Sequence, residues 1–122
     1  MVMKYIFLFI ILSVSIIINA QKPINLDEVG KYIGDSVKVC GQVYDTYYAV
    51  RTENKPTFLN IGAKYPDQKL TVVIWGDIRK KFEGNPEEVF KNKEVCVIGK
   101  LETYKDKPQI VIQKTDQIYI SN

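Results

Sequence analysis

The sequence contains no histidine and only two cysteines in 122 residues. Histidine is the commonest general base, the usual partner of a catalytic serine or cysteine, and the commonest zinc ligand outside all-cysteine sites. Its absence excludes most hydrolase and metalloenzyme chemistries. The chain also has little net charge, because Lys4 is the only charged residue in 1–20 and the rest carries 16 basic and 14 acidic side chains. Any binding of nucleic acid must therefore depend on where the charges lie.

Residues 1–20 resemble a secretory signal peptide. Lys4 gives a short positive start, and the apolar run Tyr5–Ile18 is 14 residues long, shorter than the ~20 residues of a membrane-spanning helix. Ala20 is the small residue expected before a cleavage point. We expect cleavage after Ala20 and a periplasmic or secreted domain of residues 21–122 with no stable membrane span. A retained N-terminal anchor is the alternative, because Ile18 is larger than the usual alanine.

The pattern of apolar residues after residue 20 predicts mainly β-strands. Asn25 and Glu28 have the spacing of a capping box and predict a short helix that ends at Gly34. Asn85 and Glu88 repeat this spacing and predict a second, inserted helix. Alternating or continuous apolar residues predict five strands and a short final strand. These strands cover residues 36–43, 57–61, 70–75, 94–101, 109–113 and 117–120, and residues 44–56 form a loop or a frayed strand end.

One face of each predicted strand carries the residues expected to form the core. Gly41 takes one of these positions in the first strand, which favours a bend or bulge there. The predicted core residues are Val37, Val39, Val43, Leu59, Ile61, Val72, Ile74, Val95, Val97, Leu101, Ile110 and Ile112.

Five strands with a helix between the third and the fourth are typical of the five-stranded Greek-key barrel called the OB-fold. We therefore expect an all-β domain with one inserted helix and a short N-terminal helix before the first strand. Five segments resemble OB-fold nucleic-acid-binding domains, and the resemblance spans about residues 26–113. The segments are VKVCGQV (37–43), TFLNIG (57–62), VVIWG (72–76), VCVIGKL (95–101) and YKDKPQI (104–110).

Such domains occur as anticodon-binding modules of tRNA synthetases, in helicase and exonuclease subunits, and as stand-alone secreted bacterial proteins. The resemblance implies a binding face across the second and third strands, flanked by the loops between strands one and two and between strands four and five. OB-folds also bind oligosaccharides, small ligands and proteins, so the resemblance leaves the class of ligand open.

The two cysteines lie in the first and fourth strands. Cys40 follows Val39 and Cys96 follows Val95, so both lie on the face opposite the core valines. The OB-fold makes these strands neighbours, and in an exported protein a disulfide is the favoured interpretation. A redox-active or metal-binding pair and two free buried thiols are the alternatives.

The predicted binding residues combine aromatic rings with cations. Bases of a single strand stack on aromatic faces while cations contact phosphates, which favours single-stranded DNA or RNA as the ligand. The alternative interpretation involves no ligand: the tyrosines cover the ends of the barrel, and the lysines keep the surface soluble. The candidates are Tyr44, Tyr47, Tyr48, Arg51 and Lys55 in the first loop, Phe58 and Asn60 on the second strand, and Tyr104, Lys105 and Lys107 in the second loop.

Two further features near the inserted helix allow two interpretations each. We expect Trp75 to plug the end of the barrel, with a stacking platform as the alternative. The basic run 79–81 is expected to be a solvated face, with a phosphate-contact patch as the alternative.

No catalytic constellation is recognisable in the sequence. The carboxylates lie at capping or turn positions, and Arg51 and Arg79 lack the acidic partners of a staphylococcal-type nuclease calcium site. We therefore expect no catalytic residue, no metal and no cofactor. The predicted function is that of an exported, non-catalytic module for single-stranded nucleic acid. The alternative is an extracytoplasmic module that binds a small ligand, a glycan or a protein.

Overall fold

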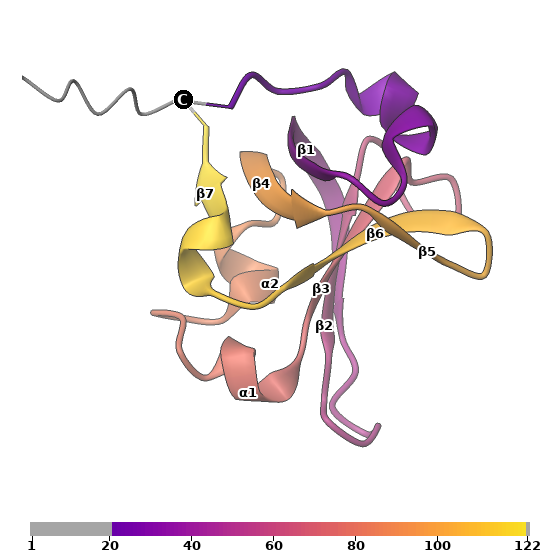
Figure 1. Cartoon of the computed structure of the whole chain (residues 1–122). Coiled ribbons are helices and arrows are strands. Elements are labelled where there is room, and N and C mark those ends of the chain that lie inside the picture. Colours follow the sequence, from indigo (N-terminus) through magenta and orange to yellow (C-terminus); the bar gives the residue numbers. More distant parts are fainter. Residues whose placement is uncertain (1–20, 122) are drawn as a thin grey trace, which may run out of the picture.

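The computed structural model describes residues 21–121, so the predicted signal segment 1–20 lies outside the described residues. Residues 21–121 form seven strands and four short helical segments (Figure 1). In chain order these are the 3-10 helix η1 (Leu26–Tyr32), β1 (Ser36–Tyr48), β2 (Thr57–Ile61), β3 (Leu70–Ile74), α1 (Gly76–Arg79), α2 (Pro86–Val89), β4 (Glu94–Lys100), β5 (Glu102–Tyr104), β6 (Lys107–Ile112), the 3-10 helix η2 (Thr115–Gln117) and β7 (Ile118–Ile120).

The strands pair in one mixed sheet with the order β5-β6-β3-β2-β1-β4-β7. The pair β3 and β6 is parallel, and the other pairs are antiparallel. The prediction of a mainly β domain is confirmed. The pairing found in residues 21–121 leaves the sheet open between β5 and β7, so the closed five-stranded barrel stays a prediction. The two strands β4 and β6 nevertheless come close, because a Cβ atom at Gly99 would lie 2.6 Å from Cγ2 of Ile110.

Three predictions about the elements differ most from the structure. Strand β1 continues to Tyr48, so the predicted loop 44–56 is reduced to residues 49–56. The inserted helix is two separate helices of four residues each, α1 and α2. The three-residue strand β5 was missed, because all three of its side chains are exposed and it shows no alternation of buried and exposed residues.

All twelve predicted core residues are buried. In β1 they alternate with exposed or partly exposed positions, as expected for a strand with one face against the core, whereas in β2, β3 and β4 the intervening Asn60, Val73 and Cys96 are buried as well. Val29 of η1 and Phe90, just after α2, join this core from outside the strands. Ile78 and Phe82 pack against it, and the rings of Phe82 and Phe90 meet edge to face with centroids 6.0 Å apart. The insert between β3 and β4 thus contributes to the core.

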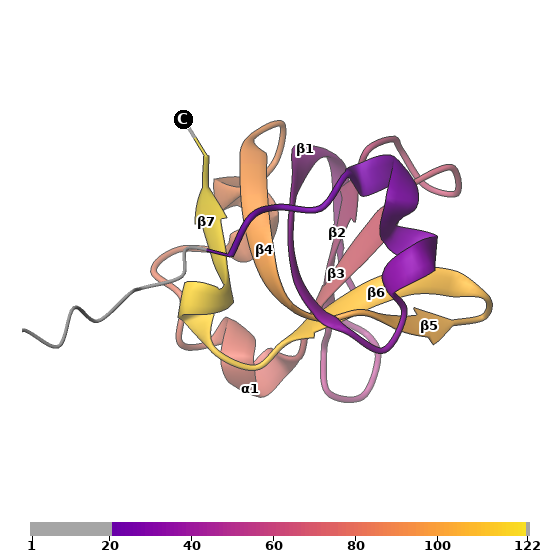
Figure 2. The same ribbon diagram turned by 45° about the horizontal axis from the view of Figure 1, so that its top comes forward.

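The helix η1 and the insert lie at opposite ends of the sheet (Figures 1 and 2). Asn25 caps η1 as predicted, since its Oδ1 accepts a hydrogen bond of 2.9 Å from the backbone N–H of Asp27. Gly41 is in regular register with Val95 of β4, so the bulge that was one of its two predicted roles is wrong, and the bend stays a prediction. Gly41 is a point of close approach, because a Cβ atom there would lie 2.7 Å from Cγ2 of Ile61 and 3.0 Å from Cδ2 of Leu26 in η1. Glycine at this position lets η1 and β2 pack against β1.

Cys40 and Cys96 form a disulfide in the structure. The two residues face each other directly in the antiparallel pair β1 and β4, with their Cα atoms 4.0 Å apart. The bond lies on the face opposite Val39 and Val97, as the alternation predicted. It therefore covalently joins two adjacent strands over a sequence separation of 56 residues.

Candidate functional site

A β-bulge in β1 determines which side chains face the candidate site. The pairing with β2 changes register between Val43 and Asp45, so Tyr44 is an extra residue with no partner in β2. Side chains alternate along a strand, and one extra residue reverses the faces beyond it. Asp45 and Tyr47 are consequently paired with Asn60 and Phe58 on the outer face.

The outer face carries a groove of about 660 Å³, which we call the aromatic groove. Four aromatic side chains line it, namely Tyr47, Phe58, Tyr65 and Tyr104. Tyr47 and Phe58 are stacked, with ring centroids 6.4 Å apart and ring planes 9° from parallel. The side chains of Tyr47, Tyr65 and Tyr104 are 63%, 69% and 61% exposed, so their rings are accessible to a ligand.

Hydrogen-bonded polar groups also line the groove. Asn60 is buried, its Nδ2 donates a hydrogen bond of 2.7 Å to Oδ1 of Asp45, and its Oδ1 accepts one of 3.3 Å from Thr71. Oδ2 of Asp45 accepts a hydrogen bond from the backbone N–H of Tyr65. These bonds connect β1, β2, β3 and the β2–β3 connection, so they fix the position of the Asp45 carboxylate and of Tyr65 beside the groove.

Two lysines of the β5–β6 hairpin supply positive charge to the groove. Nζ of Lys107 lies 5.4 Å from the ring centroid of Tyr65 and donates a hydrogen bond of 2.8 Å to the carbonyl oxygen of Pro66. Nζ of Lys105 lies 5.4 Å from the ring centroid of Tyr104. The hairpin and the β2–β3 connection, which lie on the right of Figure 1, therefore place cations next to aromatic rings on the same side of the sheet.

The structure brings together six of the ten predicted binding residues. These are Tyr47, Phe58, Asn60, Tyr104, Lys105 and Lys107. The other four lie elsewhere: Tyr44 is the bulged residue, Tyr48 lies on the opposite face of β1, Arg51 is in the exposed β1–β2 loop, and Lys55 lines a second concavity. Tyr44, Tyr47 and Tyr48 belong to β1 and not to a loop, because the strand continues through the bulge.

Sequence reasoning missed Asp45 and Tyr65, which line the groove together with the predicted residues. Asp45 follows the bulge, which the alternation of residues does not reveal. Tyr65 lies in the β2–β3 connection, which was interpreted only as a turn. Its aromatic ring in a polar turn next to Pro66 was the available signal.

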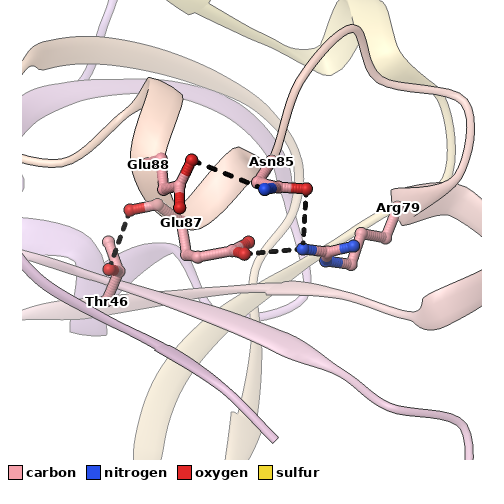
Figure 3. A network of polar contacts seen from close by, with 5 residues as sticks. All are labelled: Thr46, Arg79, Asn85, Glu87 and Glu88. Carbon is pink, nitrogen blue, oxygen red and sulfur yellow. Dashed lines mark hydrogen bonds and ion pairs between the residues drawn. The ribbon is translucent and has the colours of Figure 1, made fainter. Parts of the chain in front are cut away.

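Trp75 and Arg79 depart from their predicted environments. Trp75 does not plug the end of the core, because its side chain is 40% exposed and lines the second concavity. Arg79 is not on a solvated face either. Its guanidinium carbon lies 3.8 Å from the ring centroid of Tyr48. Its Nη2 lies 2.6 Å from Oε1 of Glu87 in α2 (Figure 3). Both charged side chains are 17% exposed.

The Arg79 contacts attach the insert to the sheet. Nη2 of Arg79 also donates a hydrogen bond of 3.2 Å to Oδ1 of Asn85, and the hydroxyl of Thr46 donates one of 2.9 Å to the backbone carbonyl of Glu87 (Figure 3). Thr46 and Tyr48 lie on the face of β1 opposite Asp45 and Tyr47. After the bulge, β1 thus presents the groove on one face and the anchor of the insert on the other.

Two other features of residues 21–121 concern metals and membranes. No three of their Cys, Asp or Glu residues gather in a cluster that could hold a metal ion. None of the helices in this part of the chain has the length and apolar character needed to cross a bilayer.

The comparisons with known proteins give a similarity of fold only. No protein-family model matches the chain, and no curated protein sequence matches it. Among solved structures, an aspartyl-tRNA synthetase from Leishmania major Friedlin is similar, with a TM-score of 0.52 and 14% sequence identity. The similarity covers 87% of this chain but 22% of the synthetase chain. The fold of residues 21–121 is therefore similar to that of one part of a much longer protein, which is consistent with the OB-fold prediction.

Proposed function

We propose that this protein is an exported, non-catalytic OB-type module that binds single-stranded nucleic acid in the aromatic groove. The observation that carries the proposal is the arrangement of Tyr47, Phe58, Tyr65 and Tyr104 around one groove, with the ammonium groups of Lys105 and Lys107 beside two of the rings. The bases of a single strand stack on aromatic faces, and the neighbouring phosphates contact cations, so a site for such a strand needs both. Signal cleavage after Ala20 and a periplasmic or secreted location are part of the proposal.

The likeness to a synthetase supports the same class of ligand. That enzyme is named for a tRNA, and the similar part covers most of this chain. A five-stranded OB barrel, with β4 close to β6, is the form of the sheet that we propose for this function.

The experiment is a salt-dependent titration of the purified full chain with labelled oligothymidine and oligouridine of about 15 nucleotides, a length at the upper end of the site sizes of OB-folds. We expect affinity in the micromolar range or weaker, and the two groove lysines alone should contribute about −1.4 to the slope of log affinity against log salt. Fluorescence anisotropy measures both quantities. No binding at low salt would contradict the proposal.

An oligosaccharide is the second candidate ligand, and one observation favours it. Among residues 21–121, Asp45 has no basic ion-pair partner, and its carboxylate lies beside the aromatic rings. A carboxylate accepts hydrogen bonds from sugar hydroxyls and repels phosphates.

The substitution Asp45→Asn separates the two candidates. It keeps one oxygen that can accept the Asn60 hydrogen bond, puts an amide nitrogen in place of the oxygen that accepts from the backbone N–H of Tyr65, and removes the negative charge. Nucleic-acid affinity should then rise, whereas oligosaccharide affinity should fall. Titration of wild type and variant with the same oligothymidine and with a mixed oligosaccharide array measures both directions.

A further inference from the structure

A second concavity of about 790 Å³ lies where β3 ends and α1 begins. Trp75 lines it together with Lys55, Lys80 and Gln113. The backbone of Trp75 is extended, with φ −68° and ψ 156°, so its side chain continues the alternation of β3. Its large apolar side chain is 40% exposed, although Val73, two residues earlier, is buried. Trp75 therefore offers accessible ring area at the edge of the core.

The second concavity and the aromatic groove lie on the same face of the sheet. Tyr47 is paired with Phe58, Phe58 with Val73, and Val73 with Val111, so these side chains form one row across β1, β2, β3 and β6. The first two members of the row line the groove, and Val111 lines the second concavity. Strands lie ~4.8 Å apart and rise ~3.3 Å per residue, which places the Cα atoms of Phe58 and Trp75 roughly 8 Å apart. This separation suits neighbouring bases of an extended strand.

The backbone around Trp75 is held firmly in place. The N–H of Gly76 donates a hydrogen bond of 2.8 Å to the carbonyl oxygen of Asn54 in the β1–β2 loop. A Cβ atom at Gly76 would lie 2.6 Å from that oxygen, so glycine is needed for the close approach. This contact places Lys55 next to Trp75, where the β1–β2 loop meets the start of α1; both of these segments lie at the lower end of the sheet in Figure 1.

The charges at the second concavity suit a phosphate chain. The side chains of Lys55 and Lys80 are exposed, and neither has an ion-pair partner among the described residues. The one carboxylate in the lining, Asp77, accepts a hydrogen bond of 3.0 Å from the backbone N–H of Ile78. Two free ammonium groups beside an accessible indole repeat the combination found in the aromatic groove.

We infer that the concavity at Trp75 is a second subsite for the same nucleic-acid strand. One base stacks on the indole of Trp75, and Lys55 and Lys80 contact the adjoining phosphates. The strand then passes over Phe58, which is partly exposed, into the aromatic groove. This inference rests on the proposed function and extends it from one groove to a track with two subsites.

The test uses the fact that Trp75 is the single tryptophan of the chain. Its fluorescence reports stacking directly, whereas anisotropy of a labelled oligothymidine reports binding anywhere on the protein. We expect both signals to change over the same range of oligothymidine concentration when the purified full chain is titrated at low salt. Trp75→Ala should weaken binding roughly 5-fold or more, and Trp75→Phe should keep most of the affinity because it retains a stacking face.

A matched control is Tyr119→Ala, which removes an exposed aromatic ring from β7, on another part of the sheet. Its affinity should equal that of wild type. Two results would overturn the second subsite while leaving the proposed binding in the aromatic groove unaffected. One is binding by anisotropy without a change in tryptophan fluorescence, and the other is binding by anisotropy with equal affinity for Trp75→Ala and wild type. Absence of any anisotropy change in wild type would overturn the proposed function, and the second subsite with it.

Discussion

The guanidinium carbon of Arg79 lies 3.8 Å from the ring centroid of Tyr48, and Glu87 of α2 forms an ion pair with the same guanidinium. This arrangement joins α1, α2 and β1 through one mostly buried cation. A buried ion pair that loses one partner leaves a charge without compensation, which costs more than the pair contributes. The contact is therefore a sensitive point for the stability of the insert.

We predict that Glu87→Gln lowers the free energy of unfolding by about 1–3 kcal/mol, because it removes the negative charge facing Arg79. The matched control is Glu88→Gln in the same helix, where the side chain is exposed and the change should stay within about 0.5 kcal/mol. Urea denaturation followed by circular dichroism measures both values. Equal stability of the two variants would contradict a structural role for the pair.

Reduction of the Cys40–Cys96 disulfide should lower the free energy of unfolding by about 4 kcal/mol, the value expected when a bond closes a loop of this length in the unfolded chain. The measurement compares urea denaturation with and without a reductant. A Cys40→Ala, Cys96→Ala double variant should already be destabilised and should not respond to the reductant. A wild-type protein that unfolds at the same urea concentration in both conditions would refute the prediction.

A side chain at Gly99 should disturb the approach of β4 to β6. The added methyl group of Gly99→Ala would lie 2.6 Å from Cγ2 of Ile110, and overpacking of this kind costs about 1–3 kcal/mol. Combining it with Ile110→Leu, which has no methyl group on Cβ, should recover part of the loss. Gly30→Ala serves as the control, because nothing lies within 4 Å of the new methyl group. Equal midpoint temperatures of thermal unfolding for Gly99→Ala and Gly30→Ala would show that β4 and β6 are not in tight contact.

Replacing rings and cations of the aromatic groove should affect binding in different ways. Tyr47→Ala or Tyr104→Ala should remove about 1–3 kcal/mol of stacking and leave the salt slope nearly unchanged. Lys105→Ala or Lys107→Ala should reduce the slope of log affinity against log salt by roughly 0.7 for each phosphate contact that is lost. Titrations of oligothymidine at several salt concentrations separate the two effects. A slope that falls equally in the tyrosine and lysine variants would contradict the assigned roles.

The core could be predicted from the sequence because period-two alternation in the strands reports which face is buried. Val39 and Val97 are fully buried as expected, and the same alternation places Cys40 and Cys96 on one face, while the expectation that their strands are neighbours came from the OB-fold. The site was predicted less completely. Residues 43–48 include polar and aromatic side chains on both faces of β1, so alternation there gives no signal for the extra residue.

The environments of Trp75 and Arg79 were missed for a related reason. Each depends on how the segment between β3 and β4 returns to the sheet, and local propensity does not determine that path. An apolar ring at the end of a strand suits either a core or a surface, and a basic run suits solvent unless a carboxylate from another element meets it. The environment of Trp75 depends on the hydrogen bond between the next residue, Gly76, and the carbonyl oxygen of Asn54. The environment of Arg79 depends on its ion pair with Glu87.

The bulge at Tyr44 has a consequence for how this chain can vary in length. Tyr44 is exposed, and it is the extra residue of β1 that has no partner in β2. Deleting it would let Asp45 follow Val43 in regular alternation, with Val43 still paired with Ile61 and Asp45 with Asn60. Tyr47 would still face the groove and Tyr48 the insert, so the ligand site and the anchor of Arg79 would both remain. Position 44 should therefore accept many substitutions and also the loss of its residue.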